Sequence, residues 1–179
     1  PFRMACIQLA TYDGTIVNVK KVLEKIGHLC DYVLWDEAWI GYNAFHPLFA
    51  GHSPMRIKDL AADAPGLFST QSVHKQGAGF SQASQIHKRD AHLRGQARYV
   101  NHKRFNESFL QNASTSPFYP LFASLDVNAK IHEGKAGEML WDRCIELGIE
   151  TRKKLRQFGR HYASVGRSAE EAWFFDPFV

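Results

Sequence analysis

The sequence predicts an α/β fold, in which a mostly parallel sheet is flanked by helices. Two short apolar runs, residues 5–10 and 32–35, have the length and composition of buried strands. Between them, from residue 19 to residue 30, apolar residues recur at the spacing of one helix face. A strand, an amphipathic helix and a second strand in this order form a βαβ unit, whose two strands run parallel.

The elements follow in order along the first half of the chain. The first strand ends in the turn cluster of residues 12–15. The second strand ends at Asp36, and residues 41–66, rich in Gly, Pro, His and Asp, are predicted to be loop with short helical turns at most. A third strand is predicted over residues 67–71. The apolar stripe of the helix between the first two strands comprises Val19, Val22, Leu23, Ile26 and Cys30.

The later half is predicted to be helical. Ser116 and Pro117 have the pattern of an N-cap followed by the first helical residue. Gly134 ends this helix, and a second helix covers residues 136–158, with Glu150 and Lys154 facing outward. The apolar face of the first helix comprises Phe118, Leu121, Phe122, Leu125 and Ala129. The residues expected to face inward from the second are Leu140, Cys144, Leu147 and Leu155.

The composition is that of a folded chain without membrane spans. Of 179 residues, 45% are hydrophobic and 22% charged, with a mean hydropathy of −0.32, and no apolar run approaches the ~18–20 residues that a span needs. Three widely spaced cysteines fit neither a disulfide framework nor a Cys-x-x-Cys metal site, which favours a reducing cytoplasm. The apolar terminal residues predict a piece of a larger protein, with residues 1–132 in its main domain and residues 133–179 as a helical continuation.

The net charge of +4 is concentrated in one segment, residues 87–104. With Tyr99 and Phe105 nearby, this segment is a candidate nucleic-acid footprint. The alternative is a solvated loop or a subunit contact, which we favour because the rest of the chain has a net charge of −1. The local charge of +5 comes from Lys88, Arg89, Arg94, Arg98, Lys103 and Arg104 against Asp90.

Two groups of polar residues follow predicted strands. Asp36 ends the second strand, and a Ser-x-His-Lys element after the third strand places Lys75 just beyond it. In α/β sheets, ligands bind outside the carboxyl ends of the strands. A desolvated lysine amine there can form an imine with an aldehyde cofactor, and a carboxylate can keep a pyridine nitrogen protonated. The alternatives are a solvated Lys75, a turn-forming or helix-capping Asp36 and a half-buried, hydrogen-bonded His74.

The residues around these groups resemble a known family. Asp-Glu-Ala-Trp at 36–39, Ser-Val-His-Lys at 72–75 and Ser-Thr-Ser-Pro at 114–117, with their flanking residues, resemble the bacterial ornithine/lysine/arginine decarboxylases. These are fold-type-I, aspartate-aminotransferase-like enzymes that depend on pyridoxal 5′-phosphate. Within the family, residues 92–104 and 125–134 look like the ornithine decarboxylase branch. The resemblance implies that the chain belongs to the large cofactor-binding domain.

The resemblance implies roles for six positions of the predicted sheet edge. Lys75 would form the imine with the cofactor, and Asp36 would pair with its ring nitrogen. Ala38 and Trp39 would lie beside the ring and the lysine, while His74, counted with Lys75 and Asp36 as catalytic, would act with a serine at the phosphate end. The implied cofactor-binding residues on this edge are Lys75, Asp36, Ala38, Trp39, Ser72 and His74.

In this family a hydroxyl of the Ser-Thr-Ser-Pro segment reaches the phosphate of a neighbouring subunit, so the resemblance implies a homo-oligomer. Ser114, Thr115 and Ser116 stay open as candidates for this contact. The implied reaction is decarboxylation of a basic amino acid, L-ornithine to putrescine and CO2 in the first place. Lysine or arginine decarboxylation, an aminotransferase-like transfer and a non-catalytic paralogue are the alternatives. The histidine spacing indicates no metal site.

Overall fold

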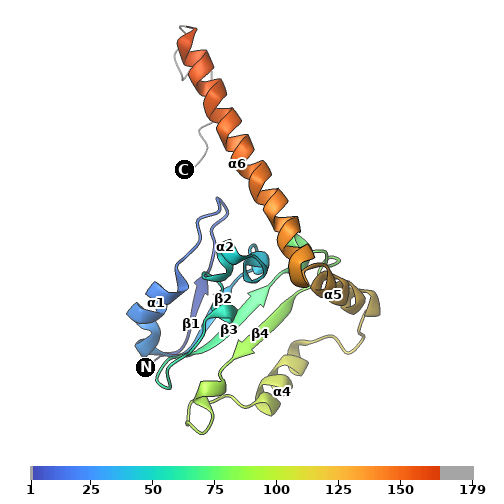
Figure 1. The fold of residues 1–179 in the computed structure, drawn as a ribbon. Coiled ribbons are helices and arrows are strands. Elements are labelled where there is room, and N and C mark those ends of the chain that lie inside the picture. Colours follow the sequence, from blue (N-terminus) through green and yellow to red (C-terminus); the bar gives the residue numbers. More distant parts are fainter. Residues whose placement is uncertain (1, 166–179) are drawn as a thin grey trace. The chain divides into compact units, whose positions relative to one another are not determined.

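A four-stranded sheet forms the centre of the first part of the chain (Figure 1). The computed structural model describes residues 2–165. The first three strands are parallel and the fourth is antiparallel to the third, which confirms the prediction of an α/β fold with a mostly parallel sheet. In sheet order the strands are β1 (Phe2–Gln8), β2 (Cys30–Asp36), β3 (Gly66–Gln71) and β4 (Gln85–Arg89).

The predicted βαβ unit is present at the start of the chain. Helix α1 (Val19–Ile26) connects β1 to β2, and the side chain of its N-cap, Asn18, accepts a hydrogen bond from the Lys21 backbone nitrogen at 3.1 Å. Its buried residue, Val19, packs in a hydrophobic core with Trp35 of β2, and both are fully buried. Burying an aliphatic side chain of this size stabilises a fold by about 1.5–3 kcal/mol, so this core fixes the sheet on one face.

Strand β4 was not predicted. Its five residues are Gln, Ile, His, Lys and Arg, all partly buried, so the apolar alternation that marks a strand is hidden by long polar side chains. Its register against β3 pairs Gln71 with Gln85 and Leu67 with Arg89. The first part of the basic segment is therefore strand, and the prediction that this segment is a solvated loop is wrong there.

Short helical turns occupy the region predicted as loop, and one longer helix follows the sheet. The loop prediction for residues 41–66 is confirmed, because its helical segments have five residues or fewer. The longer helix, α4, was missed, and Asn101 caps it by accepting from the Arg104 backbone nitrogen at 2.9 Å. These elements are η1 (Gly27–Leu29), η2 (Gly41–Phe45), α2 (Pro47–Ala50), η3 (Pro54–Arg56), α3 (Val73–Gln76), η4 (Ala91–Leu93) and α4 (His102–Asn112).

Helix α5 (Tyr119–Ile131) corrects two predictions. It begins at Tyr119 with Phe118 as its N-cap, so Ser116 and Pro117 precede it and do not start it. Its buried residues are polar, Ser124 and Asn128, whereas Phe118 is 62% exposed. These two side chains accept hydrogen bonds from the backbone nitrogens of residues 80 and 78 at 3.0 and 2.8 Å. The inward face is thus set by the backbone groups of a loop, which an apolar pattern does not reveal.

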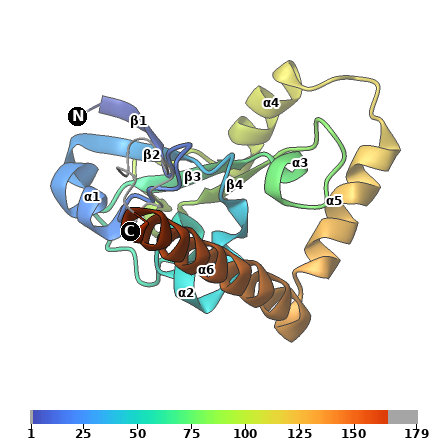
Figure 2. The ribbon, with the colours of Figure 1, turned by 90° about the horizontal axis from the view of Figure 1, so that it is seen from above.

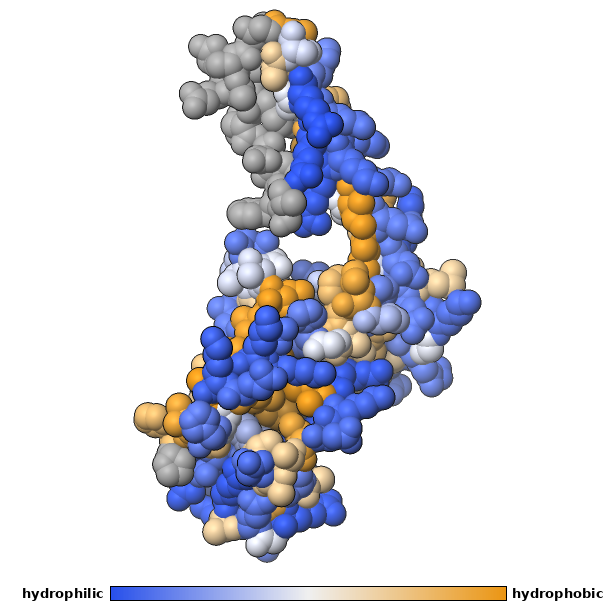
Figure 3. Space-filling model, turned by 60° about the vertical axis from the view of Figure 1, so that its left-hand side comes forward, coloured by the Kyte–Doolittle hydropathy of each residue, from blue (hydrophilic) through white to orange (hydrophobic). Residues whose placement is uncertain are grey.

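The chain divides after Glu133, and the second unit contains the long helix α6 (Gly134–Ser164). Gly134 has a φ of +65°, the left-handed conformation in which glycine carries no steric penalty, and the predicted break falls there. The stripe expected to face inward is exposed within this unit: Leu140 and Leu147 are each 46% exposed. Figure 3 shows apolar side chains along one side of this helix. None of the described helices is long and apolar enough to cross a membrane.

Candidate active site

The parallel register brings the two predicted motifs to one edge of the sheet. Asp36, the last residue of β2, pairs with Thr70 of β3. β3 ends at Gln71, and the next residue, Ser72, is the N-cap of the short helix α3, which carries His74 and Lys75. The carboxyl ends of β2 and β3 therefore place the Asp36 turn beside the Lys75 turn, as the topology of a parallel sheet requires.

A pocket of about 630 Å³ lies at this edge. Asp36 pairs with Thr70 in the sheet, and the turns that follow these strands contribute Ala38 and Ser72 to the pocket lining. The pocket volume lies in the range of about 300–1,000 Å³ that is typical of small-molecule sites. The lining residues are Asp36, Ala38, Thr70, Gln71, Ser72, Ser84, Gln85, Ile86 and Phe109. Three of the predicted site residues, Asp36, Ala38 and Ser72, thus come together.

Asp36 presents a carboxylate to this edge. Its Oδ1 accepts a hydrogen bond from the Ala38 backbone nitrogen at 2.9 Å, which is the turn-forming contact expected of an aspartate at a strand end. Its side chain is exposed, and Oδ2 accepts no hydrogen bond from the described residues. The turn contact leaves one oxygen of Asp36 for a ligand.

Lys75 and Trp39 come together from the two turns. The Lys75 Nζ lies 4.5 Å from the centroid of the Trp39 ring, within the range of a cation–π contact. Trp39 follows Ala38 in the turn after β2, and its ring centroid lies 4.6 Å from that of the Tyr12 ring. Lys75 is exposed and does not line the 630 Å³ pocket, so the expectation of a desolvated amine is wrong and the alternative of a solvated lysine describes it. The contact fixes the lysine amine at the junction of the two motifs.

His74 is held by the loop that follows it. Its Nδ1 lies 2.9 Å from the carbonyl oxygen of Ala83, and because a carbonyl only accepts, Nδ1 donates. Its backbone nitrogen also donates to this oxygen, at 3.3 Å. The half-buried ring therefore has a defined orientation, and Nε2 is its acceptor nitrogen when the imidazole is neutral.

The Ser-Thr-Ser-Pro segment lies elsewhere. Ser114, Thr115 and Ser116 are exposed in the extended connection between α4 and α5, which Figure 2 shows looping away from the sheet. The Ser114 hydroxyl accepts from the Ser116 backbone nitrogen at 3.1 Å, so the segment forms a local turn. The structure does not bring these residues to the Asp36 and Lys75 of their own chain.

Glu37 is the residue at this edge to which the sequence assigned no role. It is fully buried, and burial raises the pKa of its carboxyl, against the hydrogen bonds that it accepts from Ser69 and Gln71. The sequence did offer one signal for Glu37, because it is a second carboxyl directly after Asp36 at the end of a predicted strand. Its partners lie more than 30 residues away in the sequence, so their meeting was not visible there.

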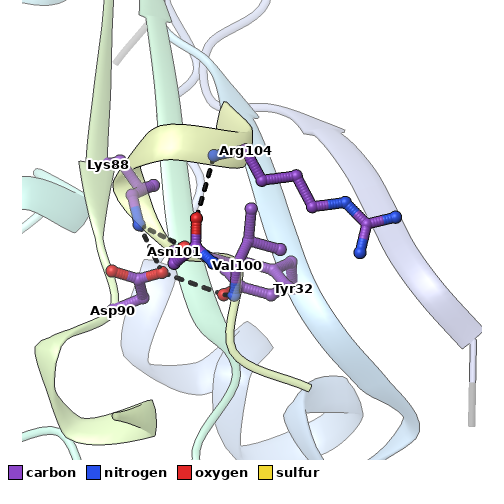
Figure 4. Close-up of polar contacts among 6 residues, drawn as sticks. All are labelled: Tyr32, Lys88, Asp90, Val100, Asn101 and Arg104. Carbon is purple, nitrogen blue, oxygen red and sulfur yellow. Dashed lines mark hydrogen bonds and ion pairs between the residues drawn. The ribbon is translucent and has the colours of Figure 1, made fainter. Parts of the chain in front are cut away.

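The opposite end of the sheet contains a second polar cluster, drawn in Figure 4. The Lys88 Nζ pairs with Asp90 Oδ2 and donates to the Val100 carbonyl oxygen, each at 2.7 Å, and its side chain is only 13% exposed. The Tyr32 hydroxyl donates to the same Asp90 oxygen at 2.9 Å and accepts from the Val100 backbone nitrogen at 2.8 Å. Desolvation by burial is the main cause that raises the pKa of Tyr32 to about 12.

Much of the basic segment binds the protein's own backbone. The Arg98 guanidinium donates to the carbonyl oxygens of Ala62 and Ala64 at 2.9 and 3.1 Å, and Arg89 donates to that of Met55 at 3.1 Å. With Lys88, three of the six basic side chains of this segment are engaged inside the fold. Arg89 and Arg98 thus bind the connection between β2 and β3, while Lys88 binds Asp90 and the Val100 carbonyl oxygen.

Comparisons with known proteins agree over nearly the whole chain. The family model for the major domain of Orn/Lys/Arg decarboxylases matches residues 1–179. The chain is 61% identical over 155 residues to the constitutive ornithine decarboxylase of Escherichia coli K12, covering 87% of this chain and 22% of that protein. It is 62% identical over 153 residues to the ornithine decarboxylase of Haemophilus influenzae, covering 86% of this chain and 21% of that protein.

More distant relatives share the fold. The biodegradative arginine decarboxylase of Escherichia coli K12 is 34% identical over 167 residues, which cover 93% of this chain and 21% of that protein. The crystal structure of the Francisella novicida lysine decarboxylase LdcF superposes with a TM-score of 0.77 at 34% identity, over 97% of this chain and 21% of that one. The chain thus spans about a fifth of the length of these proteins. It belongs to the ornithine/lysine/arginine decarboxylase family and corresponds to part of that family's major domain.

Proposed function

We propose that this chain carries the cofactor site of a pyridoxal-phosphate-dependent decarboxylase, whose substrate is L-ornithine. The observation that supports this most is the pairing of β2 with β3, which puts Asp36 and the turn of Lys75 at one edge of the sheet beside a pocket of about 630 Å³. Below, the full-length enzyme means the protein that carries this chain at the length of its relatives.

The residues at this edge fit pyridoxal phosphate. Oδ2 of Asp36 is available to accept a hydrogen bond from a protonated ring nitrogen, and a close carboxylate favours that charged form. The Ser72 hydroxyl makes no capping bond to α3, which leaves it for a phosphate oxygen. When bound, the cofactor supplies an electron sink for the electrons released as carbon dioxide leaves. The protein's own part is to bind, orient and protonate.

Lys75 would attach the cofactor through Nζ. An amine reacts with an aldehyde only after it has lost its proton, and the Trp39 ring at 4.5 Å holds the ammonium form in place until then. His74 donates from Nδ1 to the Ala83 carbonyl, so its Nε2 would be the nitrogen that acts at the phosphate end. In this proposal Asp36, at the end of β2, contacts the cofactor ring, and Lys75, in the turn after β3, attaches the cofactor.

Ornithine is proposed as the substrate from the pattern of similarity. The ornithine decarboxylases of Escherichia coli and Haemophilus influenzae are 61% and 62% identical to the chain, whereas a biodegradative arginine decarboxylase is 34% identical and lysine decarboxylases are 33% to 37% identical. Decarboxylation of ornithine would release putrescine and carbon dioxide. Lysine or arginine as the substrate of the same site is the alternative.

We further propose that the full-length enzyme is a cytoplasmic homo-oligomer. In this proposal Ser114, Thr115 or Ser116 reaches the phosphate of a neighbouring subunit, which agrees with their exposed position away from their own chain's pocket. Residues 1–132 would be a portion of the cofactor-binding domain, and residues 133–179 would continue toward the C-terminal part.

The test uses the full-length enzyme and its Lys75→Ala variant. We expect the wild type to show the visible absorbance of a lysine-bound cofactor and to turn over ornithine faster than lysine or arginine. In the variant, both the absorbance and the turnover should be lost. Retention of both in Lys75→Ala would refute the role of Lys75. Equal or faster turnover of lysine would refute ornithine as the substrate.

A further inference from the structure

Glu37 is an unusual buried carboxyl. It is 0% exposed although its neighbour Asp36, the last residue of β2, is exposed, and its backbone nitrogen donates to the Thr70 carbonyl oxygen at 2.9 Å. Its Oε2 accepts from the Ser69 hydroxyl at 2.7 Å and from the Gln71 side-chain amide at 2.5 Å. Both donors are neutral, and within residues 2–165 no ion pair involves Glu37. A buried carboxyl is more often paired with a cation.

The contacts of Glu37 continue across the sheet. Gln71, which donates to Glu37, accepts through Oε1 from the side chains of Gln85 at 2.8 Å and His87 at 3.1 Å. One hydrogen-bonded chain therefore joins the end of β2 to β3 and β4. Gln71 and Gln85 also line the pocket beside Asp36, and Gln71 immediately precedes Ser72.

We propose that Glu37 is a positioning residue for the cofactor site: its buried carboxyl ties the end of β2 to the end of β3 and so sets the placement of Asp36 relative to the turn that carries Ser72 and Lys75. This inference rests on the proposed function. Without the Glu37 acceptor, the Ser69 and Gln71 donors would be buried without a partner. Because an unpaired buried donor costs free energy, the strand ends would move so that these donors find another acceptor.

Glu37 can do this without adding a charge to the site. Burial raises the pKa of its carboxyl, which favours the protonated, neutral form. A neutral Glu37 keeps an acceptor oxygen for its two donors and places no second negative charge beside Asp36. Glutamine has the same shape, is always neutral and retains an acceptor oxygen, so Glu37→Gln is the conservative variant.

The experiment compares three variants of the full-length enzyme by titration with pyridoxal phosphate, followed by visible absorbance. We expect Glu37→Ala to lower the affinity for the cofactor by about 10–100-fold, the range typical when a residue that orients the ligands of a bound metal is mutated. Glu37→Gln should restore affinity close to that of the wild type. Asp90→Asn is the matched control, because it alters an equally buried carboxyl at the other end of the sheet and should bind the cofactor normally.

The outcomes separate this inference from the proposed function. Wild-type affinity in Glu37→Ala would overturn the inference, as would equal losses in Glu37→Ala and Asp90→Asn, because both would then reflect general stability. A Glu37→Gln variant as weak as Glu37→Ala would also overturn it. If the wild type itself bound no cofactor, the proposed function would fail instead, and the Lys75→Ala measurement identifies that case.

Discussion

Two buried carboxyls close opposite ends of the sheet, and they are held in different ways. Glu37 follows β2 and accepts from the neutral groups of Ser69 and Gln71. Asp90 follows β4, which runs antiparallel, so it lies near the start of β2, where it pairs with the Lys88 ammonium and the Tyr32 hydroxyl. Their exposed fractions are 0% and 6%. Both carboxyls are therefore buried, and they differ in that Asp90 has a charged partner whereas the named partners of Glu37 are neutral.

Because of this difference, we expect the two ends of the sheet to have different roles. A carboxylate paired with a buried cation keeps its charge and locks the packing around it, because removing either partner leaves the other charge without compensation. A carboxyl among neutral donors is driven toward its neutral form. The Asp90 end thus serves stability, and the Glu37 end holds strand ends in place while Asp36 alone presents a negative charge to the candidate site.

The largest effect on stability is expected from Lys88→Ala. This change leaves Asp90 buried without its cation, which costs about 3–5 kcal/mol in the free energy of unfolding. Denaturant unfolding of the full-length enzyme measures this cost, and cofactor affinity should stay at the wild-type value. A variant that loses cofactor affinity while keeping its stability would contradict the division between the two ends.

Tyr32→Phe should cost less, about 1–3 kcal/mol, because it removes a hydroxyl that joins Asp90 to the Val100 backbone nitrogen and leaves the latter unpaired. The stability of the variant should also depend differently on pH in the alkaline range. The folded pKa of Tyr32, about 12, lies above the ordinary value of 10, so the folded form holds this proton more tightly. Wild-type stability should fall as pH rises from 10 toward 12.

Phenylalanine has no proton to lose, so this part of the alkaline decline should be absent in Tyr32→Phe. Thermal unfolding between pH 9 and pH 11 is the measurement. Identical pH slopes in the two proteins would show that the Tyr32 hydroxyl is not protected in the fold.

Glu37→Gln should have the smallest effect, visible as a change in pH slope. The folded pKa of Glu37 is raised, so the folded state binds this proton more tightly than the unfolded state does, and stability due to this group falls as pH rises above the unfolded pKa of 4.5. The glutamine variant lacks that loss, so it should gain stability relative to the wild type between pH 4.5 and pH 7. A gain that grows toward lower pH would mean that Glu37 is ionised in the fold.

The sequence reveals the parts of this fold that depend on local patterns. The stripe from Val19 and the run ending at Trp35 predicted the βαβ unit, and the parallel register that follows from it predicted that Asp36 and Lys75 meet at one edge. Strand β4 was missed because its residues are mostly polar and their partners are distant in the sequence, as in Arg89, whose guanidinium donates to the Met55 carbonyl oxygen 34 residues earlier.

Helix α5 and Glu37 show the same limit. The start of α5 was misplaced at Ser116 because a capping pattern was present, and its inward face was misassigned because Asn128 faces a loop backbone and not an apolar surface. Glu37 meets Ser69 only after the sheet has formed. Polar contacts across strands carry no periodicity, so they become visible only in three dimensions.

We propose that Lys75, at the Glu37 end of the sheet, is the residue that attaches the cofactor. To test this, the cofactor-loaded full-length enzyme is reduced with borohydride and digested, and the modified lysine is located by mass spectrometry. We expect the cofactor's mass on the peptide that contains His74 and Lys75. Its appearance on any other lysine of residues 2–165, or on none in the whole protein, would refute the role of Lys75.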